Sequence, residues 1–249
     1  MNKQILPITG LLVGSVNEDV IVCGDPDRAT KIAKRLTSAT LLSDRREYRI
    51  YKGYFGEMPV TICSHGVGAP GASIAFEELI TAGARRIIRL GTCGGLQPDI
   101  DSGHLVIAVA AVQNTGYGRE MVPAGYPAVA DPQLTIALQS AANAGNHPHS
   151  SGLVLTRDAF YGGVAVPDVP DYQVMSAANV KAVEMECAAL FIVGSLRAVS
   201  TAAILAVDGN VLRGAETMDS YDPHQDVVTN AVESAIEIAL LALQTENNP

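Results

Sequence analysis

Short apolar runs recur along the chain and are separated by polar, glycine-rich or amphipathic segments. Residues 19–23, 105–112 and 201–207 are apolar almost throughout, which is typical of strands that are covered on both faces. Residues 45–51 alternate instead between charged and apolar positions, and a glycine turn separates them from the run at 58–63. These last two segments are expected to be neighbouring strands, with the charged one at a sheet edge or an interface.

Helical spacing of apolar residues marks the segments between the predicted strands. An Asp-Pro pair begins two of them, at residues 25–26 and 131–132, because aspartate caps a helix N-terminus and proline suits its first turn. The last predicted helix spans residues 224–243 and buries one apolar stripe. The pattern therefore predicts a single α/β domain over residues 1–249, with a mixed central sheet flanked by helices and an irregular N-terminal arm at 1–17.

Composition and charge narrow the possible functions. Hydrophobic residues make up 48% of the 249 residues and charged residues 17%, as in a packed globular domain. The formal net charge of −9 gives no support to a nucleic-acid or membrane partner. The four cysteines lack the paired spacing of metal sites and are expected to be reduced thiols. No signal segment or bilayer-length apolar run is present, so a cytoplasmic protein is expected.

The strongest candidate for a ligand site is the run Arg-Arg-Ile-Ile-Arg-Leu-Gly-Thr-Cys-Gly-Gly at residues 85–95. Its first half reads as a buried strand, and its glycines follow at the carboxyl end, where open α/β sheets bind ligands. Arg89 and Thr92 could hold an anion there with a guanidinium, a hydroxyl and free backbone amides. A plain strand-to-loop turn with a solvent-facing arginine would give the same pattern.

Three further segments are open to a functional and a structural interpretation. Gly24 and Arg28 flank a predicted helix N-terminus that would attract an anion, although an ordinary capped junction looks the same. His65 is either a ligand or, more simply, a hydrogen-bonded structural histidine. Phe160 and Tyr161 lie in an irregular segment, either as core packing or as a stacking platform for a flat ligand.

Acidic residues stand at two strand ends. Glu184 and Glu186 flank Met185 where an extended segment enters an apolar helix. Capping that helix would explain them, but a partly buried Glu186 would need donors, and sugar hydroxyls would serve. Asp208 precedes Gly209 at the end of another strand, where it is either a turn cap or a catalytic acid.

Six short motifs occur together in one order, at residues 24–28, 46–48, 65–68, 88–94, 183–186 and 207–209. In this combination the chain resembles the hexamer-forming branch of the nucleoside phosphorylase family, which includes purine nucleoside phosphorylases and uridine phosphorylases. The resemblance runs from about residue 18 to the C-terminus. Within the branch it is greatest to the malaria-parasite type, including the run Pro-His-Gln at residues 223–225.

The resemblance implies a role for each matching residue. Phosphate contacts are implied for four residues of one chain and one residue of a neighbouring subunit: Gly24, Arg28, Arg89, Thr92, and Arg46 across the dimer interface. Ribose contacts are implied for Met185 and Glu186. Base contacts are implied for Cys93, Phe160, Val183 and Asp208. Asp208 would also be the catalytic general acid on N7 of a purine.

The same resemblance implies a homo-oligomer, a hexamer built as a trimer of dimers. Its substrates would be a nucleoside and inorganic phosphate, which is a co-substrate, and no metal or other cofactor is implied. The family usually supplies a histidine from the N-terminal arm to the nucleoside 5′-hydroxyl, but residues 6–10 read Leu-Pro-Ile-Thr-Gly. Recognition of the 5′ position is therefore expected to differ, and Arg213 is at most a speculative aid to Asp208.

Two observations favour a purine over uridine as the base. Asp208 matches the acid of the purine enzymes, and residues 162–166 lack the glutamine and arginine that uridine phosphorylases use on uracil. Thr92 points mildly toward the uridine enzymes. A uridine phosphorylase, a nucleosidase that uses water, and a nucleoside-binding protein without turnover remain the alternatives, although Arg28, Arg46 and Arg89 disfavour the nucleosidase.

Overall fold

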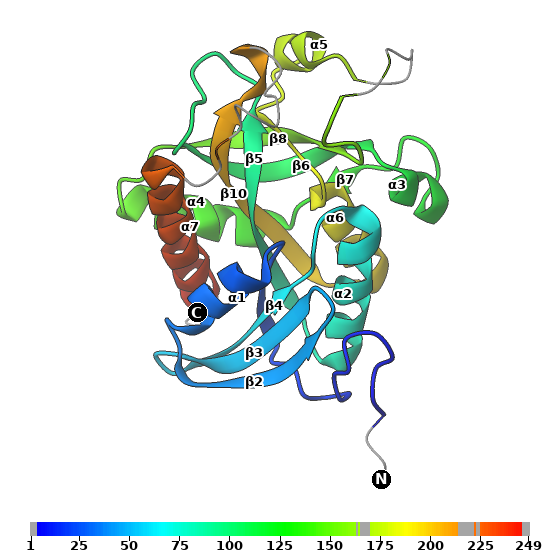
Figure 1. Ribbon diagram of the computed structural model, residues 1–249, viewed down its shortest axis with the longest axis vertical. Coiled ribbons are helices and arrows are strands. Elements are labelled where there is room, and N and C mark those ends of the chain that lie inside the picture. Colours follow the sequence, from blue (N-terminus) through cyan, green and yellow to red (C-terminus); the bar gives the residue numbers. More distant parts are fainter. Residues whose placement is uncertain (1–3, 163, 165–169, 214–221, 223–224, 246–249) are drawn as a thin grey trace.

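One mixed sheet runs through the protein and carries helices on its two faces (Figure 1). The computed structural model describes residues 4–162, 164, 170–213, 222 and 225–245. Within these residues ten strands pair into the sheet. In chain order they are β1 (Asp19–Cys23), β2 (Thr37–Arg45), β3 (Tyr48–Phe55), β4 (Met58–Ser64), β5 (Arg86–Gly95), β6 (Leu105–Asn114), β7 (Ala128–Val129), β8 (His149–Arg157), β9 (Ala182–Glu184) and β10 (Ser200–Asn210).

Five of these strands close into a ring. β5 pairs with β10, β10 with β6, β6 with β8, β8 with β9, and β9 pairs back with β5. β5 also pairs in parallel with β1, from which β4, β3 and β2 continue as an open extension. β5 is therefore shared by the ring and the extension, so the residues at its carboxyl end are held from several sides.

Helices cover both faces of the sheet. Ile21 on β1 packs in one apolar core with helices α1 (Pro26–Ala33), α4 (Pro132–Ala144) and α7 (Asp226–Thr245). Its neighbour Val22 packs in the opposite core with α2 (Ala69–Ala82) and α6 (Cys187–Arg197). Figure 1 shows these two groups of helices on opposite sides of the sheet. The short helices lie in connections: α3 (Gly116–Met121), α5 (Tyr172–Ala177) and the 3-10 turn η1 (Val211–Arg213).

The expected α/β fold with a mixed sheet flanked by helices is confirmed. Both Asp-Pro start signals act as predicted. The Asp25 side chain accepts a hydrogen bond from the amide of Asp27, and Asp131 accepts from the amides of Gln133 and Leu134. Each cap satisfies amides that the first helical turn leaves without partners.

Three local expectations were wrong. Residues 45–51 are not one strand: β2 ends at Arg45, and Arg46 takes a left-handed backbone conformation (φ 56°) in the turn before β3. The edge strand is β2, which the apolar pattern missed because it is polar and largely exposed. The glycine-rich residues 91–95 are strand and not loop, because β10 and β9 give their backbone pairing partners. Residues 113–131, whose glycine, proline and tyrosine content predicts a long loop, also contain α3 and β7.

The described part of the N-terminal arm is irregular, as expected, but it is tied to the body of the protein. The carboxylate of Glu78 on α2 accepts hydrogen bonds from the amides of Ile8 (3.0 Å) and Thr9 (2.7 Å) and from the hydroxyl of Thr9 (2.6 Å). The carbonyl oxygen of Thr9 accepts a further bond from Ser43 on β2 (2.5 Å). The arm thus joins α2 to the edge strand.

Candidate active site

Arg89 is the centre of a buried polar cluster near the middle of β5. Its side chain is only 4% exposed, and Nη2 lies 2.5 Å from Glu186 Oε2 and 3.2 Å from Glu184 Oε2. Burial alone would lower the pKa of Arg89, but the negative charge of Glu186 and its neighbours outweighs it and raises the pKa. The Nε of Arg89 is buried and has no hydrogen-bond partner among the described residues. One donor of a fixed cation is therefore unused.

His65 contacts the same guanidinium from the end of β4. Its Nε2 lies 3.4 Å from Arg89 Nη1, and its Nδ1 lies 2.9 Å from the carbonyl oxygen of Gly66. Because arginine can only donate, Nε2 accepts and Nδ1 carries the proton. Burial first, and then the charge of Arg89, hold the pKa of His65 well below its ordinary value. His65 is thus a neutral, hydrogen-bonded histidine that helps to fix Arg89.

The side chain of Glu184 caps the start of helix α6, whose N-cap position is Glu186. Its buried carboxylate accepts hydrogen bonds from the Thr156 hydroxyl (2.5 Å) and from the amides of Glu186 (2.8 Å) and Cys187 (2.9 Å). Thr156 in turn accepts from the amide of Ala188 (3.0 Å). The capping role considered for this pair of acids therefore belongs to Glu184, and Thr156 on β8 is its unforeseen partner.

Glu186, in contrast, faces two other segments. It is 5% exposed, its Oε1 accepts from the amide of Gly68 (2.5 Å), and its Oε2 pairs with Arg89. Burial raises the pKa of Glu186, although Arg89 acts in the opposite direction. Its carboxylate joins the β4–α2 connection, where Gly68 lies, to the strand that carries Arg89. This is the partly buried carboxylate, supplied with donors, that the sequence predicts.

Two glycines allow this close packing. A Cβ atom built on Gly91 would lie 2.6 Å from Nη2 and 2.7 Å from Cζ of Arg89, so the guanidinium rests directly against the backbone of β5. A Cβ atom on Gly24 would lie 3.2 Å from the carbonyl oxygen of Gly66. The amide of Gly66 donates to the carbonyl of Gly24 (2.9 Å), so the loops after β1 and β4 are joined beside the cluster.

Cys93 and Asp208 lie further along the same end of the sheet. β10 continues past Asp208 to Asn210, but its pairing with β5 shifts between Val207 and Gly209. Such a bulge re-aims the extra residue, here Asp208, which is 7% exposed. Burial first, then the charge of Asp208 and that of Glu184, raise the pKa of the Cys93 thiol. Cys93 thus lies within the electrostatic reach of both Asp208 and the Arg89 cluster.

Three other predicted phosphate residues have half-buried or exposed side chains. Arg28 on α1 and Thr92 on β5 are half-buried, and their side chains make no hydrogen bond or ion pair within the described residues. Arg46 is exposed in the turn between β2 and β3. The adjacent Glu47 packs against Gly66, so this turn lies against the loop that follows β4.

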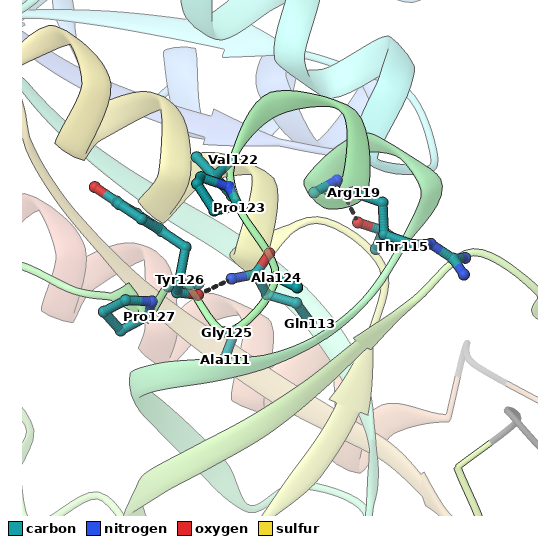
Figure 2. A pocket seen from close by; sticks show the side chains of 12 residues that line it. Ala111, Gln113, Thr115, Arg119, Val122, Pro123, Ala124, Gly125, Tyr126 and Pro127 are labelled. Atoms are coloured by element: carbon teal, nitrogen blue, oxygen red, sulfur yellow. Dashed lines mark hydrogen bonds between the residues drawn. The ribbon is translucent and has the colours of Figure 1, made fainter.

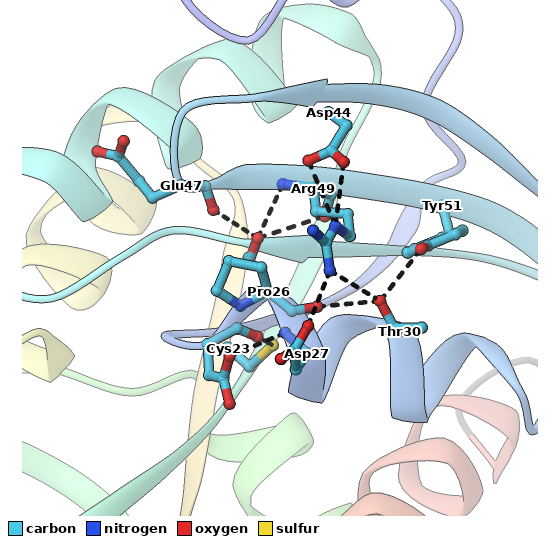
Figure 3. A network of polar contacts seen from close by, with 10 residues as sticks. Cys23, Pro26, Asp27, Thr30, Asp44, Glu47, Arg49 and Tyr51 are labelled. Carbon is cyan, nitrogen blue, oxygen red and sulfur yellow. Dashed lines mark hydrogen bonds and ion pairs between the residues drawn. The ribbon is translucent and has the colours of Figure 1, made fainter.

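A polar network fixes that turn to helix α1 (Figure 3). Arg49 on β3 donates to Asp44 on β2 (3.3 Å), to Asp27 on α1 (3.0 Å) and to the Thr30 hydroxyl (3.3 Å). Ser64 on β4 donates to the carbonyl oxygen of Glu47 (2.5 Å). The network connects the elements that carry Arg28 and Arg46, and the apolar pattern of the sequence gave no sign of it.

The predicted base and sugar residues have different environments. Val183 on β9 and Met185 are half-buried, and Val183 packs against the apolar cluster formed by Leu96, Leu155 and Val180. Phe160 is 55% exposed and meets Tyr161 edge-to-face, with ring centroids 5.1 Å apart, so the pair is not part of the core. Most of residues 162–166 and of residues 210–222 lie outside the described residues, as does most of the Pro-His-Gln motif at 223–225. Arg213 pairs with Asp101 (2.8 Å).

A separate cavity of about 380 Å³ opens between β6 and the segment that contains α3 and β7 (Figure 2). It is lined by Gln113, Arg119 and Tyr126, among other residues of the segment 111–128. The predicted site residues do not line it.

All four cysteines are free and buried. Among the described residues, no helix has the length and apolar character needed to cross a membrane, and no group of three His, Cys, Asp or Glu side chains is placed to hold a metal ion.

Comparison with known families shows which superfamily the chain belongs to. The model of the phosphorylase superfamily matches residues 18–244. The chain belongs to this superfamily. The match includes β1, β5, β9 and β10, which are the strands that carry Arg89, Glu184 and Asp208 or lead into the loops beside them.

Relatives within the superfamily carry more than one substrate name. The chain is 39% identical over 247 residues to a uridine phosphorylase of Treponema pallidum, covering 96% of this chain and 95% of the relative. It is 37% identical over 223 residues to a purine nucleoside phosphorylase of Plasmodium falciparum, covering 89% and 88%. The structure of a purine nucleoside phosphorylase from Toxoplasma gondii in complex with immucillin-H superposes with a TM-score of 0.90 at 34% identity, covering 99% and 98% of the two chains. The expected membership in the nucleoside phosphorylases is confirmed, and the chain is an enzyme of this class, a pentosyltransferase.

Proposed function

We propose that the protein is a purine nucleoside phosphorylase, which converts a purine ribonucleoside or deoxyribonucleoside and phosphate reversibly to the free base and pentose 1-phosphate. The observation that carries the proposal is the contact between Arg89, near the middle of β5, and Glu186. Phosphorolysis requires a cation for the attacking phosphate next to an acceptor for the sugar hydroxyls, because the two substrates react at C1′. The cluster supplies both groups in direct contact, out of water.

Arg89 is suited to hold the phosphate. Its charge is permanent, and its buried Nε has no partner among the described residues. Arg28 and Thr92 also have side-chain donors that no described residue uses, and Gly24 keeps the loop after β1 close to the cluster. A phosphate dianion placed among these donors would be desolvated and oriented for attack on C1′.

Glu186 is suited to hold the ribose, with Met185 beside it. The amide of Gly68 keeps one carboxylate oxygen in place, so the carboxylate stays anchored when Arg89 turns toward phosphate. It would then accept hydrogen bonds from the 2′- and 3′-hydroxyls. Holding both substrates in line converts a two-molecule collision into a step within one complex.

The bond-breaking step follows from this arrangement. A phosphate oxygen forms a bond to C1′ while the bond from C1′ to the base nitrogen breaks, through a state with oxocarbenium character. The electron pair of the broken bond passes to the base, and Asp208 donates a proton to N7 of the purine so that a neutral base leaves. Val183, Cys93 and Phe160 would surround the base. Asp208, set at the end of β10 by its bulge, is the feature that supports a purine.

A uridine phosphorylase is the second candidate, with the same phosphate and ribose residues. Thr92 favours it, because threonine at this position resembles the uridine enzymes. The relatives carry both purine and uridine names, so their names do not choose between the two bases.

We also propose that the working form is a hexamer, a trimer of dimers, in which Arg46 completes the phosphate site of the neighbouring subunit. The exposure of Arg46 supports this, as does the position of its turn against the loop after β4. No cofactor is needed in this scheme, because inorganic phosphate is the second substrate.

The experiment is a phosphate-dependence assay over inosine, guanosine, adenosine and uridine, with the released base measured by chromatography and the pentose 1-phosphate by phosphorus NMR. Phosphate-dependent release of a purine base is expected. A preference for uridine would establish the second candidate instead. Equal release with and without phosphate would show a nucleosidase and overturn both.

A further inference from the structure

Arg157, the last residue of β8, lies next to the proposed base end of the site. Two residues earlier, Leu155 pairs with Val183 on β9, and one residue earlier Thr156 bonds to Glu184. Arg157 therefore extends from a strand that is already fixed to the proposed base residue Val183 and to Glu184 beside the Arg89 cluster.

Among the described residues, the side chain of Tyr172 holds the guanidinium of Arg157. Its Nη1 donates to the hydroxyl of Tyr172 (2.7 Å), and its Cζ lies 5.4 Å from the centroid of that ring. Tyr172 packs against the apolar cluster of Leu96, Leu155 and Val180, as Val183 and Val211 also do. The Cγ1 atoms of these two valines lie 3.4 and 2.7 Å from where a Cβ of Gly94 would stand, so the cluster borders β5 just beyond Cys93. Arg157 thus sits against the wall of the proposed base pocket.

The Nε of Arg157 is buried and has no hydrogen-bond partner among the described residues. Leaving a buried donor unpaired costs free energy, so a buried N–H without a protein partner is usually hydrogen-bonded to a ligand or a water. Arg89 is the other arginine with a buried, unpaired Nε in the described part of the chain, and it is the proposed phosphate ligand. The same property at Arg157, at the other end of the cluster, indicates a second donor kept for substrate.

We infer that Arg157 determines base specificity by donating to a carbonyl oxygen of the base, and so selects 6-oxopurine nucleosides over adenosine. The inference rests on the proposed function and names its substrate class. Arginine offers only donors, and hypoxanthine and guanine present an oxygen acceptor where adenine presents an amino group. The adenine amino group would leave Nε of Arg157 unpaired, because the N–H donors of the amino group would face the N–H donors of the guanidinium. The preference for the oxo base therefore follows from the chemistry of a single side chain.

The test compares wild type with Arg157→Met, which keeps an apolar stem but removes every donor. Arg119→Met, in the cavity of Figure 2, is the matched control, because it removes an arginine away from the cluster. At saturating phosphate, wild type should prefer inosine to adenosine. Arg157→Met should lower kcat/KM for inosine by about 10- to 100-fold, the value of a hydrogen bond to a charged group, with a much smaller change for adenosine. Arg119→Met should change neither.

Titration calorimetry with free hypoxanthine and adenine separates this inference from the proposed function. If no nucleoside undergoes phosphorolysis, the proposed function fails, and base binding alone then decides the role of Arg157. A folded Arg157→Met protein with an unchanged ratio of inosine to adenosine, or of hypoxanthine to adenine, overturns the inference. If circular dichroism shows that the variant does not fold, the wild-type affinities decide: equal binding of hypoxanthine and adenine overturns it.

Discussion

Replacing Gly91 by alanine is expected to disable phosphate binding without removing any charged group. The new methyl would stand 2.6 Å from Nη2, 2.7 Å from Cζ and 2.8 Å from Nη1 of Arg89. The guanidinium cannot simply swing into open space, because Glu184, Glu186 and His65 hold it in a buried pocket. Either the ion pair with Glu186 breaks or β5 shifts.

The size of the effect follows from the overlap. Non-bonded heavy atoms prefer a separation of roughly 3.5 to 4 Å, so the guanidinium must move by about 1 Å. A misplacement of about 1 Å in a substrate-positioning group costs on the order of 10²-fold in rate. That factor corresponds to about 2.7 kcal/mol of transition-state stabilisation. Folding should lose about 1–3 kcal/mol in addition, as for other overpacked sites.

The assay is the initial rate of base release over a range of phosphate concentrations at fixed nucleoside, with thermal unfolding measured in parallel. Gly91→Ala should lower kcat/KM for phosphate by about 10²-fold. Gly116→Ala is the control, because its Cβ would meet only Asp158 at an ordinary 3.7 Å. If the Gly91 variant folds and keeps wild-type phosphate kinetics, Arg89 is not the phosphate ligand that its geometry indicates.

Three other predictions concern the acid, the shared site and pH. Asp208→Asn should cut purine nucleoside turnover by about 10²- to 10⁴-fold with little change in substrate binding, and wild-type turnover would reduce Asp208 to a turn cap. Arg46→Ala and Asp208→Ala should each be inactive but regain activity when mixed under subunit exchange, since one site of a mixed dimer carries neither lesion; no recovery despite verified exchange speaks against a shared site. The pKa of His65 lies well below its ordinary 6.5, so the unfolded chain binds a proton there more readily and stability should fall as pH drops below 6.5. Urea unfolding between about pH 7 and 5 should show a shallower loss for His65→Gln, and an identical slope would mean that His65 does not titrate on unfolding.

The sequence predicted those elements that depend on residues close together in the chain. Asp25 and Asp131 cap their helices because a side chain meets amides two or three residues away, and that relation is visible in the sequence. The apolar run at β1 was also found, since burial on both faces requires it. The polar strand β2 was missed because only pairing with β3 makes it a strand.

Distant partners decided what the sequence left open at the site. Glu184 and Glu186 have the same side chain and stand two residues apart, so the sequence does not distinguish their roles. Contacts with residues far away in the chain do: Glu184 bonds to Thr156, and Glu186 bonds to Gly68. Residues 91–95 have the composition of a loop, but pairing with β10 overrides that tendency. Arg157 escaped notice because a charged residue at a strand end is ordinary until its buried Nε is seen.

The hydrogen bonds between Thr9 and Glu78 limit how far the protein can be shortened from its N-terminus. Removal of residues up to about 15 would delete no helix and no strand of the sheet. It would, however, strip three donors from a carboxylate that is 9% exposed, on a helix whose other buried residues are mostly apolar. Burying a charged group without hydrogen-bond donors is costly, so the packing around this carboxylate is expected to open to water. In protein engineering, the arm should therefore be kept as part of the folded body, although it contains no helix and no strand of the sheet.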